Sequence, residues 1–259
     1  MTWYEEWFLY FEFVYGKTVH TVEAAMAAYG MKGDKAVNKV IDTKLDMILR
    51  ARQQWPKYAS LIEDEFLRNT KWNQKYKGKR VVFWDNTGIV LHKPSQSLLQ
   101  RITYSSYYAG NVAKGGIFIQ LCGWLGTHEL FTGAMSDSEY MNTTNILEEQ
   151  EIFQESDGGT KFTNVLDRGY RSTQAAWRAG GQFIHQPTFA KSDAKFSTID
   201  TLSAASVAAD RSGNERAVRV AKMSSYVKSG TTKHKNTVRL ADVWLAWSWQ
   251  ANFMFKPVL

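Results

Sequence analysis

The 259-residue sequence has a single cysteine, Cys122, and only four prolines. One thiol excludes a disulfide within the chain and a zinc site built from thiolates. The five histidines show no HxxxH or HExxH spacing, so none of them belongs to a recognisable metal motif. No apolar run approaches the roughly 18 residues of a membrane span, and the acidic, aromatic start MTWYEEWFLYFEF is unlike a signal peptide. These absences predict a soluble intracellular protein.

The composition is that of a folded chain with excess positive charge. Hydrophobic residues make up 44% of the sequence and charged residues 22%, which excludes a disordered protein. Lysine and arginine total 32 against 25 acidic residues, so the net charge is +7. This excess favours a polyanionic partner such as nucleic acid, although many basic proteins bind nothing acidic.

The first 70 residues carry helical patterns. In residues 21–29 apolar side chains recur at i, i+3, i+4 and i+7, and Gly30 ends the run. A second helix is expected at about 35–52, with Asp34 as its cap. Two helices with so short a link fit a helix-turn-helix, and an ordinary helical hairpin is the alternative. The polar residues expected to remain free on the outer face of the second helix are Lys35, Asn38, Lys39 and Asp42.

From residue 75 onward short apolar runs alternate with turn residues. VVFW (81–84) is typical of a strand buried on both faces, and Asp85 is expected to end it before the turn NTG. Further strands are expected at 98–110, 115–125, 127–135, 163–166 and 181–187. Helices are expected at 136–152, from about residue 214, and at 240–253. The sequence therefore predicts a helical region at 1–70 followed by an α/β domain at 75–259.

Two aspartates, Asp85 and Asp167, each follow an apolar strand. Neighbouring strands that end on the same edge of an open α/β sheet bring such residues close together. Two close carboxylates repel each other unless a cation joins them, and a site made of oxygen ligands selects Mg²⁺ or Mn²⁺. The alternative is that each aspartate caps the turn after its strand.

Glu215 is the third candidate acid. On a helix it shares a face with Arg219, Lys222 and Tyr226. It is the lone acid in a segment of eight basic residues, which is either a solvated face or a place where metal ions lie beside phosphates. These basic residues are Arg211, Arg216, Arg219, Lys222, Lys228, Lys233, Lys235 and Arg239.

An ordered set of motifs carries a resemblance to a known family. FWDNTGI, YSSYYAG with Lys114 following, GxxSD at 133–137, LDRGY and RSGNERAV resemble, in this order, the DDE-superfamily endonuclease domain of PIF/Harbinger-type transposases and their domesticated relatives. The segment YGKTVHTVEAAMAAYGMKGDKAVNKVI is similar to the helix-turn-helix that precedes this domain. The resemblance covers about residues 15–253 and rests on the order of the motifs rather than on any one of them. The sequence departs from the commonest form at Ser212, Gly213 and Asn214, where relatives often carry a bulkier residue and a histidine or aspartate.

The resemblance implies an RNase H-like fold, in which helices flank a mixed five-stranded sheet. Asp85 on the first strand, Asp167 after the fourth and Glu215 on a helix packed against the sheet would hold two Mg²⁺ or Mn²⁺ ions. These three residues would be catalytic, cutting DNA phosphodiesters by hydrolysis and strand transfer. Asp137 would be a helix cap or a residue behind the metal ligands.

The resemblance also implies the partners. Double-stranded DNA, as element ends and as target, would be bound by Arg216, Arg219 and Lys222 and by the groove-facing residues Lys35, Asn38 and Lys39. A homo-oligomer on DNA, a Myb-like accessory protein and a nuclear location would follow. Two other readings stay open: a domesticated DNA-binding protein that has lost cleavage, and a glycoside hydrolase that uses two of the carboxylates.

Overall fold

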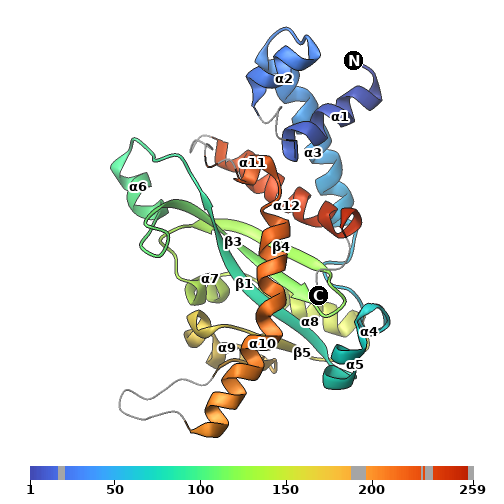
Figure 1. Cartoon of the computed structure of the whole chain (residues 1–259), viewed down its shortest axis with the longest axis vertical. Coiled ribbons are helices and arrows are strands. Elements are labelled where there is room, and N and C mark those ends of the chain that lie inside the picture. The colour runs from blue at the N-terminus through green and yellow to red at the C-terminus, as the bar shows by residue number, and fades with distance from the viewer. Residues whose placement is uncertain (17–20, 188–196, 229, 231–235, 256–259) are drawn as a thin grey trace.

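Helices flank a single mixed sheet on both faces in the computed structural model, which describes residues 1–16, 21–187, 197–228, 230 and 236–255 (Figure 1). The strands in this part of the chain are β1 (Arg80–Val90), β2 (Tyr104–Ser105), β3 (Gly110–Gln120), β4 (Leu125–Thr132), β5 (Phe162–Val165) and β6 (Phe183–His185). Their order is β2-β3-β1-β5-β6, and β4 also pairs with β3. β1 is antiparallel to β3 and parallel to β5, which makes the sheet mixed. The two-residue β2 is an addition to the five strands expected.

The helices fall into an N-terminal group and two layers on the sheet. The helices are α1 (Trp3–Val14), α2 (Val22–Tyr29), α3 (Asp34–Gln53), α4 (Leu61–Leu67), α5 (Thr70–Tyr76), α6 (Ser97–Thr103), α7 (Asp137–Thr143), α8 (Ile146–Ser156), α9 (Gln174–Ala179), α10 (Thr198–Ala221), α11 (Ser225–Lys228) and α12 (Thr237–Met254), with a 3₁₀ turn η1 (Arg168–Thr173). Figure 1 shows α10 crossing one face of the sheet, with α7, α8 and α9 behind it. Among the described residues, no helix combines the length and the apolar character needed to cross a bilayer.

Alternation along β1 explains why both faces of the sheet are covered. Phe83 belongs to the apolar cluster that includes Val207 of α10 and Trp244 of α12. Trp84, the next residue, belongs to a second cluster with Tyr140 of α7 and others from α8 and α9. Successive side chains of a strand point to opposite faces, so a continuous apolar run requires a helical layer on each side. The prediction of a strand buried on both faces is confirmed.

The turn expected after Asp85 is wrong. β1 continues to Val90, and residues 82–90 pair with β3 throughout. Asn86 and Gly88, which suggested a turn, instead meet specific neighbours: Asn86 donates to Asp137, and Gly88 lies under the ring of Tyr108. The long partner strand β3 therefore overrides the local turn preference.

Three other expectations about secondary structure are corrected. Residues 98–110 form α6 and the short β2 instead of one strand, and 136–152 form two helices, α7 and α8. The basic helix begins at Thr198 and ends at Ala221, so Tyr226 lies on the separate α11 and does not share its face. At this end of the helix the indole nitrogen of Trp247 donates to the oxygen of Val220, and the hydroxyl of Ser224 donates to the oxygen of Val14.

The N-terminal helices agree with the sequence pattern in their bounds. Gly30 ends α2 in the left-handed conformation at φ 60°, which glycine adopts without strain. Gly33 is the N-cap of α3 with no side-chain cap bond, so the expected cap at Asp34 is wrong. Apolar side chains of α1 and α3 join the same core cluster as those of α12 and the sheet. This arrangement is a packed helix pair, and its role in DNA binding stays a prediction.

Candidate active site

A cleft of about 880 Å³ is lined by the three predicted acids. Asp85 comes from the middle of β1, Asp167 follows β5, and Glu215 lies on α10. The parallel pairing of β1 with β5 ends at Phe83 opposite Val165, and each aspartate lies two residues beyond that pair. Their common position is therefore a consequence of strand register. The cleft is also lined by Asn86, Thr87, Tyr104, Ser105, Ser106, Tyr107, Tyr108, Lys114, Gly133, Ala134, Met135, Ser136, Asp137, Gly169 and Val218.

Asp85 has the environment of a carboxyl group that resists ionisation. Burial raises its pKa to about 6, the positive charge of Arg211 acts in the opposite direction, and the charges of Asp167 and Asp137 raise the pKa further. Its Oδ1 accepts a hydrogen bond from the backbone N–H of Asn86 at 2.8 Å. A partly buried acid among other acids is a place where added positive charge is favourable.

The two carboxylate oxygens of Asp167 have different partners, a backbone N–H in the following turn and the side chain of Arg211. Oδ1 accepts from the N–H of Gly169 at 2.6 Å, and Oδ2 lies 3.5 Å from the Arg211 guanidinium. The turn-capping alternative is thus correct for Asp167, whereas Asp85 lies within a strand. Asp167 is 33% exposed, so its outer oxygen remains accessible from the cleft.

Asp137 is a fourth acid in the cleft. Its Oδ1 accepts from Asn86 Nδ2 at 3.1 Å and lies 3.6 Å from Lys114 Nζ. Ser136, not Asp137, caps α7, through a capping box with Glu139, so the expected role of Asp137 as the cap is wrong. The hydrogen bond from Asn86 therefore holds Asp137 next to β1, beside Asp85.

Three buried polar atoms near the acids have no hydrogen-bond partner among the described residues: Nε of Arg211 and two others. One is the hydroxyl of Tyr170, whose pKa burial raises well above its usual value, with further contributions from the charges of Asp137, Asp85 and Asp167. The other is Oδ1 of Asn214, whose Nδ2 donates to the oxygen of Trp84 at 3.3 Å. Unsatisfied buried polar atoms at an acidic cleft fit a site that holds water or an ion.

Glu215 lies in the same cleft but is set apart from the aspartates. It is exposed on α10, and it is not among the charges that shift the pKa of Asp85. Across the described residues, no three His, Cys, Asp or Glu side chains stand close enough together to hold a metal ion. The three predicted acids line one cleft, but their described side chains do not form a complete set of metal ligands.

The basic residues expected to bind DNA have different surroundings. Arg216 and Arg219 are exposed on α10, as are Lys35 and Lys39 on α3. Lys222 is partly buried at the end of α10; burial lowers its pKa, and the charge of Asp85 raises it in part. Lys222 is thus within electrostatic reach of the cleft. Lys233 and Lys235, the histidines His20 and His234 and the side chain of Ser212 lie outside the described residues.

Asn38 and Asp42 are not free, and this expectation is wrong. Asn38 Oδ1 accepts from Arg239 Nη1 at 2.6 Å, and both oxygens of Asp42 accept from Arg239 Nη2 at 2.7 and 2.9 Å. Arg239 belongs to α12, against which α3 packs. Oδ1 of Asn38 is therefore engaged within the protein rather than free.

A pH-dependent stability difference follows from Asp85. The pKa of Asp85 in the folded protein is about 6, above the usual 3.8, so ionisation of Asp85 lowers the free energy of unfolding. This loss is absent below about pH 4 and grows as the pH rises through about 6. Asp85→Asn is therefore expected to raise the free energy of unfolding by at most about 3 kcal/mol at about pH 8, and to leave it unchanged at about pH 4. Urea denaturation in EDTA at the two pH values measures this. An equal effect at both would show that Asp85 is not buried as described.

Sequence reasoning missed two residues that lie behind the lining of the cleft and interact with its acids. Tyr170 and Arg211 were visible only as part of LDRGY and as one of eight basic residues. Neither has a spacing that places it beside Asp85, because both positions depend on how η1 and α10 pack. The repeated tyrosines of YSSYYAG were the available signal for the rim of the cleft, which Tyr104, Tyr107 and Tyr108 form.

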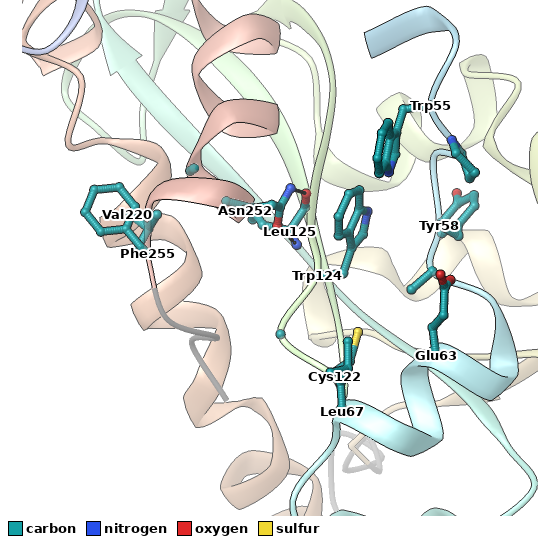
Figure 2. Close-up of a pocket in the computed structure, with 14 residues that line it drawn as sticks. Trp55, Tyr58, Glu63, Leu67, Cys122, Trp124, Leu125, Val220, Asn252 and Phe255 are labelled. Carbon is teal, nitrogen blue, oxygen red and sulfur yellow. Dashed lines mark hydrogen bonds between the residues drawn. The ribbon is translucent and has the colours of Figure 1, made fainter. Parts of the chain in front are cut away.

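A second cavity, of about 310 Å³, is apolar and lacks comparable chemistry. Figure 2 shows Trp55 and Tyr58 across the cavity from Val220 and Phe255. Its one acid is Glu63, whose Oε2 accepts from the backbone N–H and the hydroxyl of Ser60 at the start of α4. The acidic cleft is therefore the candidate active site.

A buried polar cluster lies beside β4. Lys57 Nζ lies 3.1 Å from His128 Nδ1 and donates to Glu149. Burial lowers the pKa of His128 well below its usual range, and the positive charges of Lys57 and Arg52 lower it further. His128 is thus a neutral core histidine.

The chain matches no model of a known protein family, no curated protein and no solved structure.

Proposed function

We propose that this protein is a metal-dependent DNA endonuclease of the DDE transposase type, built on an RNase H-like domain. The observation that carries the proposal is the cleft lined together by Asp85, Asp167 and Glu215, at the place where β1 and β5 stop pairing. A mixed sheet with β1 between an antiparallel β3 and a parallel β5 supports the RNase H-like assignment. So does the position of α10 against β1 and β3.

The donor set fits Mg²⁺ or Mn²⁺. Carboxylate oxygens are the ligands these hard cations prefer, and Asp85 lies among like charges that Arg211 compensates only in part. Asp85 and Asp167 would hold two ions, with Glu215 completing the set. Bound Mg²⁺ supplies Lewis-acid chemistry, which activates the attacking oxygen and stabilises the leaving oxygen of a phosphodiester.

Glu215 has the freedom that this role requires. It is an exposed side chain on a helix, and exposed side chains change rotamer within picoseconds to nanoseconds. In this proposal a rotamer change of Glu215 would bring its carboxylate toward the ions held by the aspartates. The unsatisfied Oδ1 of Asn214, the preceding residue, would be a further oxygen that faces a bound cation or its water.

The chain's basic residues would hold the DNA backbone. Arg216 and Arg219 follow Glu215 on α10 and are exposed, so they can neutralise phosphates next to the acids. Lys35 and Lys39 of the α2–α3 pair would contact a second stretch of duplex as a helix-turn-helix does. Assembly as a homo-oligomer on DNA, a Myb-like partner and a nuclear location belong to the same proposal.

Nicking of supercoiled plasmid tests the proposal. Purified protein with Mg²⁺ or Mn²⁺ is expected to convert supercoiled DNA to the open circle, and EDTA is expected to stop the reaction completely. Both metals should also raise the melting temperature of the protein, an effect Asp85→Asn should remove. Binding of DNA in EDTA with no cutting in either metal would instead favour the alternative, a DNA-binding protein of the same fold without activity.

A further inference from the structure

Three tyrosines from one short segment form the rim of the acidic cleft. Tyr104 lies on β2, and Tyr107 and Tyr108 lie in the turn between β2 and β3. Tyr107 is 86% exposed and Tyr104 is 50% exposed. Large aromatic rings left exposed beside a polar cleft are a feature of binding surfaces rather than of packing.

Tyr108 anchors this rim to the strand that carries Asp85. Its hydroxyl oxygen accepts from the backbone N–H of Gly88 at 2.8 Å, and its ring covers Gly88 so closely that a Cβ there would lie 2.6 Å from a ring carbon. Only glycine leaves room for this contact. The position of the rim is therefore tied to a point on β1 three residues after Asp85.

Tyr107 is held by Tyr108 but keeps most of its surface open. The two rings meet edge to face, with their centroids 4.9 Å apart and an interplanar angle of 82°. The turn closes through Ala109, which has a φ of 48°, a left-handed conformation that is uncommon for a residue with a Cβ. The exposed ring is thus presented by a specific backbone turn.

We propose that Tyr107, together with Tyr104, is a stacking platform for unpaired DNA bases next to the strand that enters the cleft. This inference rests on the proposed function, because it identifies the substrate as DNA with a single-stranded segment at the cut site. The acids of the cleft repel phosphates, whereas every base has a π face that stacks on an aromatic ring irrespective of sequence. The rim therefore holds bases where the cleft alone does not attract the backbone.

Binding of short labelled oligonucleotides in EDTA tests the platform without cleavage. Tyr107→Ala is expected to weaken single-strand binding by about 5- to 150-fold, the equivalent of about 1–3 kcal/mol per stacked base. Binding of the blunt duplex of the same sequence should stay within about twofold of wild type. Tyr107→Phe keeps the ring and should bind as wild type does, whereas Tyr107→Leu keeps apolar area without a π face and should resemble Tyr107→Ala.

The matched control is Tyr4→Ala. Tyr4 is a tyrosine of similar exposure, 78%, on α1 away from the cleft residues, so its loss should leave both affinities unchanged. A fluorescent adenine analogue in the single strand should be quenched by stacking on the wild type and not on Tyr107→Ala. Circular dichroism melting confirms that the variants are folded, as expected for so exposed a side chain.

Two results would overturn the platform: single-strand affinity unchanged in Tyr107→Ala, or an equal loss for strand and duplex. The outcome is separable from that of the nicking assay. If the wild type nicks DNA in Mg²⁺ while Tyr107→Ala binds single strands normally, the platform alone is wrong. If Tyr107 controls single-strand binding while no metal supports nicking, the proposed endonuclease activity is wrong and the platform stands.

Discussion

Asp85→Ala is expected to lower the rate of Mg²⁺-dependent DNA nicking about a thousandfold, the equivalent of about 4 kcal/mol of transition-state stabilisation. Asp85 is the most central candidate ligand, because it is partly buried on β1 and interacts with the charges of Arg211, Asp167 and Asp137. The measurement is the initial rate of plasmid relaxation at saturating Mg²⁺. DNA binding in EDTA should be intact or improved, because the substitution removes a negative charge next to the phosphates.

Two companion variants make this result specific. Asp85→Asn keeps the volume of the side chain and should lose as much activity as Asp85→Ala. Glu148→Ala removes an exposed acid from the first turn of α8, outside the cleft, and should nick at the wild-type rate. Nicking by Asp85→Ala at the wild-type rate would rule out Asp85 as a metal ligand. The nicking rate of a further variant, Glu215→Gln, tests separately whether Glu215 acts as a metal ligand together with the two aspartates.

The second large effect concerns the ion pair between Asp64 and Arg68, whose side chains are both fully buried. Arg68 Nη2 donates to Asp64 Oδ2 at 2.5 Å, and Asp64 Oδ1 accepts from the N–H of Cys122 at 2.7 Å. Arg68 also donates to the oxygens of Tyr76 and Lys79, so the pair joins α4 to α5 and to the end of β3. Asp64→Ala leaves a buried guanidinium without its counter-charge and is expected to lower the free energy of unfolding by about 3–5 kcal/mol.

Denaturation by urea at neutral pH measures this loss, and an exposed pair supplies the control. Asp46 and Arg50 form an i,i+4 ion pair on the surface of α3, and Asp46→Ala should cost less than about 1 kcal/mol. Replacing both buried partners by apolar residues, Asp64→Leu with Arg68→Met, should recover much of the stability, because no isolated charge then remains. Equal small costs for Asp64→Ala and Asp46→Ala would show that Asp64 is hydrated.

Local sequence pattern correctly predicted the elements that are determined by residues close together in the chain. The helices at α2, α3 and α12 and the apolar start of β1 have the expected places, because amphipathic period and unbroken apolar runs depend on residues close in sequence. Pattern failed at β1 after Asp85 and at the end of α10. In each case the segment contacts residues distant in the chain: β3 pairs with the whole second half of β1, and Trp247 donates to the carbonyl oxygen of Val220.

The candidate site divides in the same way. The sequence singled out Asp85, Asp167 and Glu215, because acids after apolar runs and a lone acid among cations are visible without a structure. It could not indicate that Asn86 binds Asp137 or that Arg211 lies beside Asp167. Nor could it show that Arg239 donates a hydrogen bond to Oδ1 of Asn38 on α3.

By itself the sequence determined a basic α/β protein with a helical N-terminal region, and it determined which acids could carry chemistry. Only the tertiary structure decided that these acids line one cleft and that Asp85 is buried enough to raise its pKa to about 6. The tyrosine rim likewise depends on contact between Tyr108 and Gly88. The physical reason is how far apart in the chain the interacting residues are. Composition and periodicity depend on residues that are neighbours in the sequence. Burial, strand register and charge pairing arise between distant segments, which meet only when the sheet and its helices assemble.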